Sequence, residues 1–215
     1  MSDRGLAPFT FGNASGIDRA EGAVVIKPSG VKYHAITPDD LVVVDFDGGV
    51  MEGARRPSSD LPTHLVLYRA FSGIGGVAHA HSHYATVFAQ AGKEIPCLGT
   101  THADHFGGPI PVARMLRESE VAGEYEANTG HAIVERFRGL DPMANPAVLL
   151  PGHAPFAWGN SPEAAVENMA LLEKVARLAF DTLLLDAAAA QLPDHVRSKH
   201  FTRKHGPSAY YGQPK

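Results

Sequence analysis

The chain has 215 residues with a formal net charge of −4 at pH 7, and 44% of its residues are hydrophobic. This length and composition suit one globular domain with its own core, so we expect a single domain over residues 1–215. The net negative charge argues against general nucleic-acid binding, and a single cysteine, Cys97, excludes an internal disulfide and a thiolate zinc site.

Three features of the sequence bear on where the protein is found. A lone cysteine is typical of proteins in the reducing cytoplasm. No apolar run reaches the length of about 18 residues that a membrane span needs. The first residues lack the charged region and apolar run of a signal peptide. We therefore expect a cytoplasmic protein with no membrane partner.

The first half of the chain predicts strands followed by a helix. Residues 22–30 (GAVVIKPSG) indicate a strand that ends in a turn, and residues 39–49 (DDLVVVDFDGG) indicate a second strand that ends in a hairpin signal. Residues 55–71 then open a helix, because Ser58, Ser59 and Asp60 are all favourable N-cap types.

The second half alternates in the same way. Residues 76–82 (GVAHAHS) predict a strand, residues 84–92 a helix that ends at a glycine, and residues 146–153 (PAVLLPGH) an apolar strand. Residues 160–185 predict a long helix with a serine cap. Because strands and helices interleave, the sequence predicts an α/β fold with a central sheet.

The histidines are unevenly distributed. Five of the 12 histidines lie between Gly75 and Gly108. His79 and His81 are two residues apart on a predicted strand, where side chains at i and i+2 share one face, so both imidazoles can reach one ion. His153 ends another apolar strand, and Asp60 begins a helix. Three imidazoles and a carboxylate would suit Zn²⁺ or another divalent first-row ion.

The residues alone leave other interpretations open. A His-x-His pair on a strand is also found at polar sheet edges, His153 could be an ordinary loop histidine, and Asp60 could simply cap a helix. The basic tail, with Arg203 and Lys204, is typical of a solvated helix end.

Six stretches together resemble the class II sugar-phosphate aldolase and epimerase family, which includes the adducin-like proteins. In chain order they are GNASGIDRAEGAVVIKPSGV (12–31), GARRPSSDLPTH (53–64), HAHSHYATVFAQAGKEIPCLGTTHADHFGG (79–108), GEYEANTG (123–130), HAPFAWGNSPEAAVENMALLE (153–173) and KHFTRKHGPSAYYGQ (199–213). The resemblance implies an α/β domain with three layers, α/β/α, around a mostly antiparallel sheet. It also implies that the family's N-terminal helix is missing from this chain.

The resemblance also implies roles for individual residues. The implied metal ligands are Asp60, His79, His81 and His153, with Zn²⁺ as the ion and Mn²⁺ or Co²⁺ as possible substitutes. The implied phosphate site comprises Gly12, Asn13, Lys27, Ser29, Gly30, Ser58 and Ser59. This suits an anion, because glycine lets backbone N–H groups approach, hydroxyls donate, and a helix N-terminus is positive. The implied catalytic residues are Asp104, Tyr211 and His200.

The family members that the chain resembles most interconvert L-ribulose 5-phosphate and D-xylulose 5-phosphate. The implied mechanism breaks and remakes the C3–C4 bond with a metal ion as Lewis acid, so that C4 is inverted. Asp60 favours this activity over the related aldolases, which carry Glu at its position. The resemblance further implies a homotetramer with active sites at subunit interfaces. The alternatives are a sibling aldolase or decarboxylase, or a non-catalytic protein on the same fold.

Overall fold

The structure, a computed structural model, describes residues 1, 4–7, 10–205 and 209–211. Within these residues, seven strands form one sheet in the order β4-β3-β2-β1-β5-β7-β6, and each neighbouring pair is antiparallel. The strands are β1 (Asn13–Asp18), β2 (Ala23–Ile26), β3 (Val42–Asp45), β4 (Val50–Glu52), β5 (Gly76–His79), β6 (Ala147–Leu149) and β7 (Pro155–Gly159).

The described residues also form seven α-helices and two short 3₁₀ helices. The α-helices are α1 (Leu61–Ala70), α2 (His83–Gln90), α3 (Thr100–Ala103), α4 (Glu118–Ala122), α5 (Tyr125–Arg136), α6 (Pro162–Leu185) and α7 (Asp194–His205). The 3₁₀ helices are Tyr33–Ala35 and Pro38–Asp40. Within the described parts of the chain, no helix combines the length and the apolar character that a membrane span requires.

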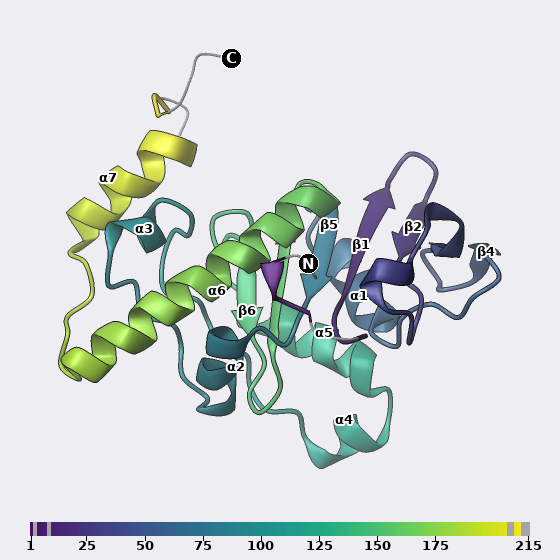
Figure 1. Ribbon diagram of the computed structural model, residues 1–215, viewed down its shortest axis with the longest axis horizontal. Coiled ribbons are helices and arrows are strands. Elements are labelled where there is room, and N and C mark those ends of the chain that lie inside the picture. Colours follow the sequence, from purple (N-terminus) through teal and green to yellow (C-terminus); the bar gives the residue numbers. More distant parts are fainter. Residues whose placement is uncertain (2–3, 8–9, 206–208, 212–215) are drawn as a thin grey trace.

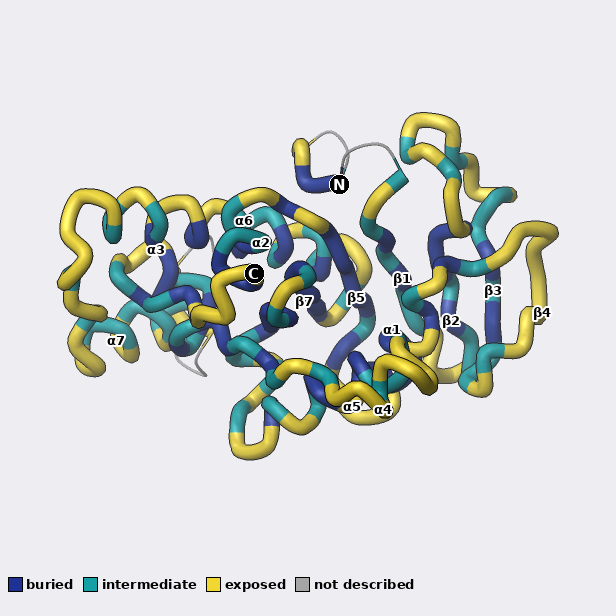
Figure 2. Tube along the Cα trace, turned by 90° about the horizontal axis from the view of Figure 1, so that it is seen from below, coloured by how far each residue is buried: buried dark blue, intermediate teal, exposed yellow. Residues whose placement is uncertain are grey.

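Helices cover both faces of the sheet, with α2 and α6 on one face and α1 and α5 on the other (Figure 1 and Figure 2). Successive residues of a strand point to opposite faces. On β5, Val77 therefore packs in the core under α1 and α5, while Ala78 packs in the core under α6. The expected three layers and antiparallel sheet are confirmed.

Most of the expected elements are present, but some differ in extent and others were not expected. The strand that contains His79 ends at that residue, so His81 lies beyond it. The basic tail forms a full helix, α7, rather than only a helix end. The strand β7 and the helices α3, α4 and α5 were not expected from the sequence. Nor was β1, because its residues, NASGID, include several of the types that are depleted in strands.

A row of three glycines lets α6 begin directly against the sheet. Gly16 of β1, Gly76 of β5 and Gly159 of β7 are register partners on adjacent strands. A Cβ at Gly76 would lie 2.5 Å from the Cα of Pro162, the first residue of α6. Because main-chain atoms cannot move aside as a flexible side chain can, this contact excludes any side chain.

We predict that Gly76→Ala lowers the free energy of unfolding by about 1–3 kcal/mol, because the added methyl overpacks the start of α6. Urea denaturation measures the change. The matched control is Gly99→Ala, because Gly99 has extended backbone and nothing within 4 Å of a Cβ. The control should change stability by less than about 0.5 kcal/mol. Equal stability of the two variants would contradict the packing account.

Candidate active site

One cavity contains all of the residues predicted for the metal and phosphate sites. It has a volume of ≈ 370 Å³ and lies where the end of β5 meets the loops before β1, after β2, before α1 and after β6. The predicted residues that line it are Gly12, Asn13, Lys27, Ser29, Gly30, Ser58, Ser59, Asp60, His79, His81 and His153. Segments up to about 140 residues apart in sequence therefore meet at one point.

Three imidazoles converge in this cavity. One ring nitrogen from each of His79, His81 and His153 lies within 4.8 Å of the others. His79 is buried, its ring stacks on Phe156 with centroids 4.2 Å apart, and its Nδ1 lies 2.9 Å from the Pro155 carbonyl. Since a carbonyl can only accept, Nδ1–H donates to it, and Nε2 is left with a free lone pair.

The electrostatics of the three rings suit a cation. Burial lowers the pKa of His79 to about 3, and it also lowers the pKa values of His81 and His153. The rings are therefore neutral at pH 7, as metal ligands must be. His153 Nδ1 is buried without a hydrogen-bond partner among the described residues. The donor set thus fits a divalent ion that prefers nitrogen.

Asp60 adds a carboxylate to the same cavity. It stands at the N-cap of α1, but its side chain makes no capping bond. Its Oδ2 instead accepts a hydrogen bond from Asn13 Nδ2 at 2.6 Å and lies 3.9 Å from His79 Nε2. The amide of Asn13, which the sequence suggested for phosphate, thus contacts the carboxylate. Asp60 is held toward the imidazoles and does not cap its helix through its side chain.

The other side of the cavity suits an anion. Gly12 and Gly30 have φ of 74° and 70°, which are costly for residues with a side chain. A Cβ at Gly12 would also lie 2.7 Å from the His79 carbonyl. Lys27 is buried, with Nζ 3.1 Å from the Pro28 carbonyl, and burial lowers its pKa. Together with the open N-terminus of α1, these groups offer N–H donors and a positive charge.

The predicted catalytic residues lie elsewhere in the chain. Figure 1 and Figure 2 show α3 and α7 together at one end of the molecule, away from β1. Asp104, at the end of α3, contacts His200 Nδ1 at 3.0 Å and Arg203 at 2.9 and 3.1 Å. Tyr211 follows α7, and the Arg203 guanidinium lies 4.9 Å from the centre of its ring. Among the described residues, none from α3 or α7 lines the metal cavity.

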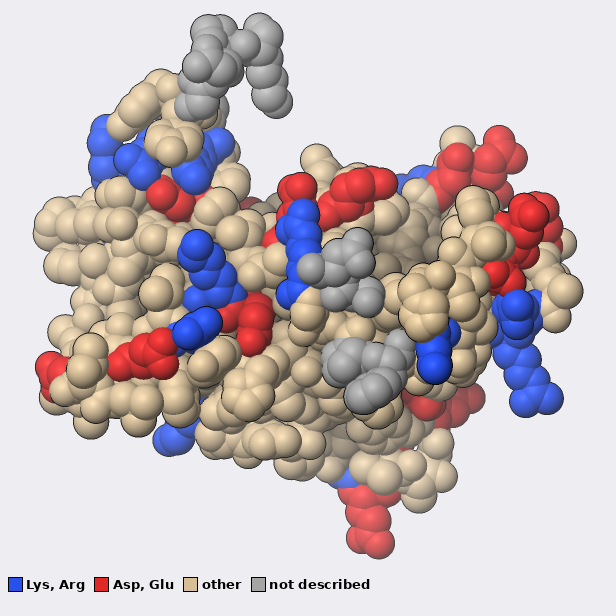
Figure 3. All heavy atoms as spheres, viewed as in Figure 1, with Lys and Arg blue, Asp and Glu red and all other residues tan. Residues whose placement is uncertain are grey.

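The partners of Asp104 keep it ionised and dock α7. Although burial raises its pKa, hydrogen bonds from Arg203 and His200 hold the pKa of Asp104 below its ordinary value. Lys204 adds a second positive charge beside that of Arg203, 3.8 Å from Asp104. Figure 3 shows Lys and Arg side chains gathered over α7. The sequence interpretation of Arg203 and Lys204 as merely solvated missed this contact. The signal was their spacing from His200, at i+3 and i+4, which places them on one side of a helix.

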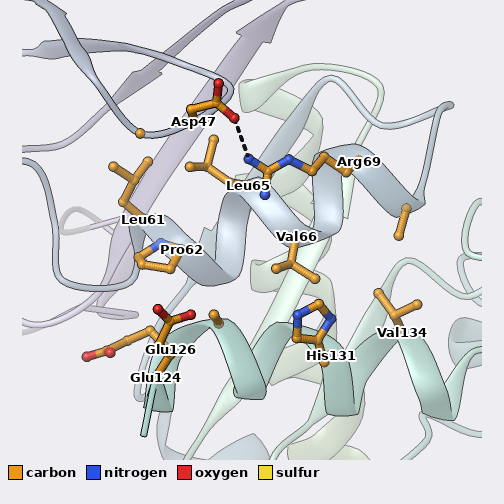
Figure 4. Close-up of a pocket in the computed structure, with 13 residues that line it drawn as sticks. Asp47, Leu61, Pro62, Leu65, Val66, Arg69, Glu124, Glu126, His131 and Val134 are labelled. Carbon is orange, nitrogen blue, oxygen red and sulfur yellow. Dashed lines mark ion pairs between the residues drawn. The ribbon is translucent and has the colours of Figure 1, made fainter.

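A larger cavity, of ≈ 760 Å³, lies between α1 and α5 (Figure 4). Its apolar lining includes Leu65 and Val66, and Glu124 and Glu126 stand near one end. Its cationic side chain, Arg69, is already paired with a carboxylate at 3.7 Å. Carboxylates repel a phosphate, so the smaller cavity with the imidazoles is the candidate active site.

Comparison with known proteins agrees with this geometry. The sequence pattern of the Class II Aldolase and Adducin N-terminal domain matches residues 1–180. The chain belongs to the class II aldolase and adducin family. An L-ribulose-5-phosphate 4-epimerase, UlaF, of Salmonella paratyphi B is 53% identical over 209 residues, which cover 97% of this chain and 92% of that protein.

Solved structures of family members share the fold. An L-fuculose 1-phosphate aldolase superposes with a TM-score of 0.77 at 28% identity, covering 92% of this chain and 87% of the other. The l-fuculose-1-phosphate aldolase of Thermus thermophilus superposes with a TM-score of 0.68 at 26% identity, covering 87% and 91%. This α/β fold with one antiparallel sheet is therefore that of the class II aldolases.

We predict that Asp104→Asn increases hydrogen exchange of the α7 amides by about tenfold, since losing charged hydrogen bonds weakens the docking of the helix. Exchange followed by mass spectrometry measures it. The control is Asp181→Asn, which removes a more exposed carboxylate, 3.6 Å from Arg177, from α6. This control should leave α7 unchanged. Unaltered α7 exchange in Asp104→Asn would refute the docking role.

Proposed function

We propose that the protein is an L-ribulose-5-phosphate 4-epimerase, an isomerase that interconverts L-ribulose 5-phosphate and D-xylulose 5-phosphate. The observation that carries this proposal is the single cavity in which three neutral imidazoles and Asp60 face anion-binding turns and Lys27. Such a cavity suits a small sugar that carries a phosphate at one end and oxygen ligands for a cation at the other. The 53% identity to an epimerase supports the same activity.

The cofactor we propose is Zn²⁺, held by His79, His81, His153 and Asp60. Mn²⁺ and Co²⁺ accept the same nitrogen and oxygen ligands. Such an ion acts as a Lewis acid that polarises the substrate carbonyl and stabilises developing negative charge on oxygen. The chain's own part is to keep the three imidazoles neutral and to turn the carboxylate of Asp60 toward them, through the hydrogen bond from Asn13.

The phosphate turns have a specific task in this reaction. The proton on C4 is not adjacent to the carbonyl and is not acidic, so C4 is inverted by cleavage and re-formation of the C3–C4 bond. Cleavage leaves a two-carbon aldehyde that carries the phosphate. We propose that the phosphate is held by the turns and the helix start that contain Gly12, Ser29, Gly30, Ser58 and Ser59. The aldehyde meanwhile rotates and presents its other face for re-formation of the bond. Retention by these groups prevents release of the fragment.

Cleavage and re-formation each move one proton. The C4 hydroxyl loses its proton as the bond breaks, and the new hydroxyl gains one on the opposite face. We propose Asp104 and Tyr211 for these two transfers, one on each face, with His200 beside Asp104. Asp104 suits the role of base, because its hydrogen bonds with Arg203 and His200 keep it ionised.

These residues act in the cavity of a neighbouring subunit. In one chain, α3 and α7 lie away from β1, and no described residue of either helix lines the metal cavity. We therefore propose that Asp104 and Tyr211 reach a metal site across an interface. Apolar side chains are available to build one: Tyr211 is 60% exposed, and Met115, beside Gly152, is 63% exposed. We propose a homotetramer in the cytoplasm, in which each site contains residues from two subunits.

The alternative activity is that of a sibling aldolase, because two solved relatives are L-fuculose 1-phosphate aldolases. Asp60 disfavours it. A longer Glu at this position can leave a metal and serve as a base, whereas the shorter Asp60 is tied to Asn13 beside His79. Acid–base work then falls to Asp104 and Tyr211.

The test is turnover of L-ribulose 5-phosphate, with D-xylulose 5-phosphate detected by a coupled enzyme. We predict that the metal-loaded protein forms this product, that a chelator abolishes it, and that Zn²⁺ or Mn²⁺ restores it. Release of free glycolaldehyde phosphate without xylulose 5-phosphate would mean an aldolase and would overturn the proposal.

The same assay tests the base, provided that docking of α7 is controlled for. We predict that Asp104→Asn lowers kcat by about 10²–10⁴-fold, the usual worth of a general acid or base. Arg203→Gln is the matched control, because it breaks the same ion pair but keeps the carboxylate. It should cost much less. Equal losses in the two variants would show that Asp104 acts only by docking the helix.

A further inference from the structure

A ladder of buried polar side chains joins β1 to α1 directly behind the metal cavity. Asp60, His64 and Tyr68 are four residues apart, so they share one side of the start and body of α1. Asn13 and Ser15 are two apart and share one face of β1. The first contact is Asn13 to Asp60, and the following contacts join Ser15 to His64 at 2.6 Å and to Tyr68 at 2.8 Å.

His64 is the centre of this ladder. It is fully buried, and its Nδ1 is the atom that contacts Ser15. Its ring also packs edge-on against Phe156, with centroids 5.9 Å apart, and Phe156 stacks on His79 at 4.2 Å. His64 therefore contacts Ser15, on the strand that also carries Asn13, and it contacts the Phe156 ring that supports His79. It also lies one helical turn below Asp60.

A histidine is a poor choice here if the site needs packing alone. Burial lowers the pKa of His64 to about 4, so the ring is neutral at pH 7. Its Nε2 is buried without a hydrogen-bond partner in the described parts of the chain. An unpaired buried nitrogen destabilises the fold relative to an apolar ring of the same size. The hydrogen bond between His64 and Ser15 is what such an apolar ring could not make.

We propose that His64 is a positioning residue for the metal centre: through Ser15 and Phe156 it fixes β1, α1 and β7 so that Asp60 and His79 face each other before a metal binds. This inference rests on the metal site proposed above. Residues that orient metal ligands without touching the metal are expected to change its affinity by about 10–100-fold.

The test is a competitive titration of metal-free protein with Co²⁺ against a chelator, with thermal unfolding of the same samples. We expect His64→Phe to weaken Co²⁺ binding by about tenfold or more. His64→Asn should recover much of the affinity, because an amide can replace Nδ1 at Ser15. Should His64→Phe fail to fold, Ser15→Ala is expected to weaken Co²⁺ binding in the same direction.

The matched control is Thr63→Val. Thr63 is buried in the same turn of α1, but its hydroxyl donates to the Glu126 carbonyl at 2.6 Å, in α5. Its loss should lower stability without changing Co²⁺ affinity. Unchanged affinity in His64→Phe, or an equal loss in Thr63→Val, would overturn the positioning role. Failure of the unaltered protein to bind Co²⁺ would instead refute the metal site itself.

Discussion

The register of β5 between β1 and β7 is the constraint on which the site depends. This register pairs His79 with Asn13 on one side and with Phe156 on the other. Asn13 holds Asp60, and Phe156 supports the ring of His79. A shift of one residue would turn every side chain of β5 to the opposite face. The row of glycines under α6 opposes such a shift, because Gly76 is the residue of β5 that admits the start of that helix.

The candidate metal and phosphate residues lie in one part of the molecule, and the candidate acid–base residues lie in another. The imidazoles, the carboxylate and the turns at Gly12 and Gly30 meet where β5 ends, in the middle of the sheet. The candidate acid–base residues lie at the end of α3, on α7 and after α7, which are not part of the sheet. Asp104 docks α7 through Arg203, whose guanidinium lies beside the ring of Tyr211. The helix α7 lies at the end of the molecule away from β1. In the function proposed above, one part binds substrate and cation, and the other moves protons. The proposed subunit interface would join them.

The sequence predicted the composition of the cavity better than its internal contacts. Residue types and motif order selected eleven of the fourteen residues that line the cavity, because a cation and an anion each require particular chemical groups. The strand β1 was missed, since its Asn, Ser, Gly and Asp residues are weak strand formers that only pairing with β2 and β5 stabilises. The bond from Asn13 to Asp60 and the ladder through His64 were also beyond the sequence, because they depend on the register of elements about 50 residues apart. The docking of α7 on Asp104 joins groups almost 100 residues apart, which no local pattern encodes.

The central claim is that each active site is built from two subunits, and mixing inactive variants tests it most directly. His81→Asn removes an imidazole from the metal cavity, and Asp104→Asn removes the base from the far end of the chain. Each variant alone should be inactive. If sites are shared, co-refolded equal amounts should regain about a quarter of the unaltered activity, because in a ring of identical contacts that share of sites receives both intact halves. No recovery from a mixture that forms mixed oligomers would contradict the account and would confine the active site to one chain.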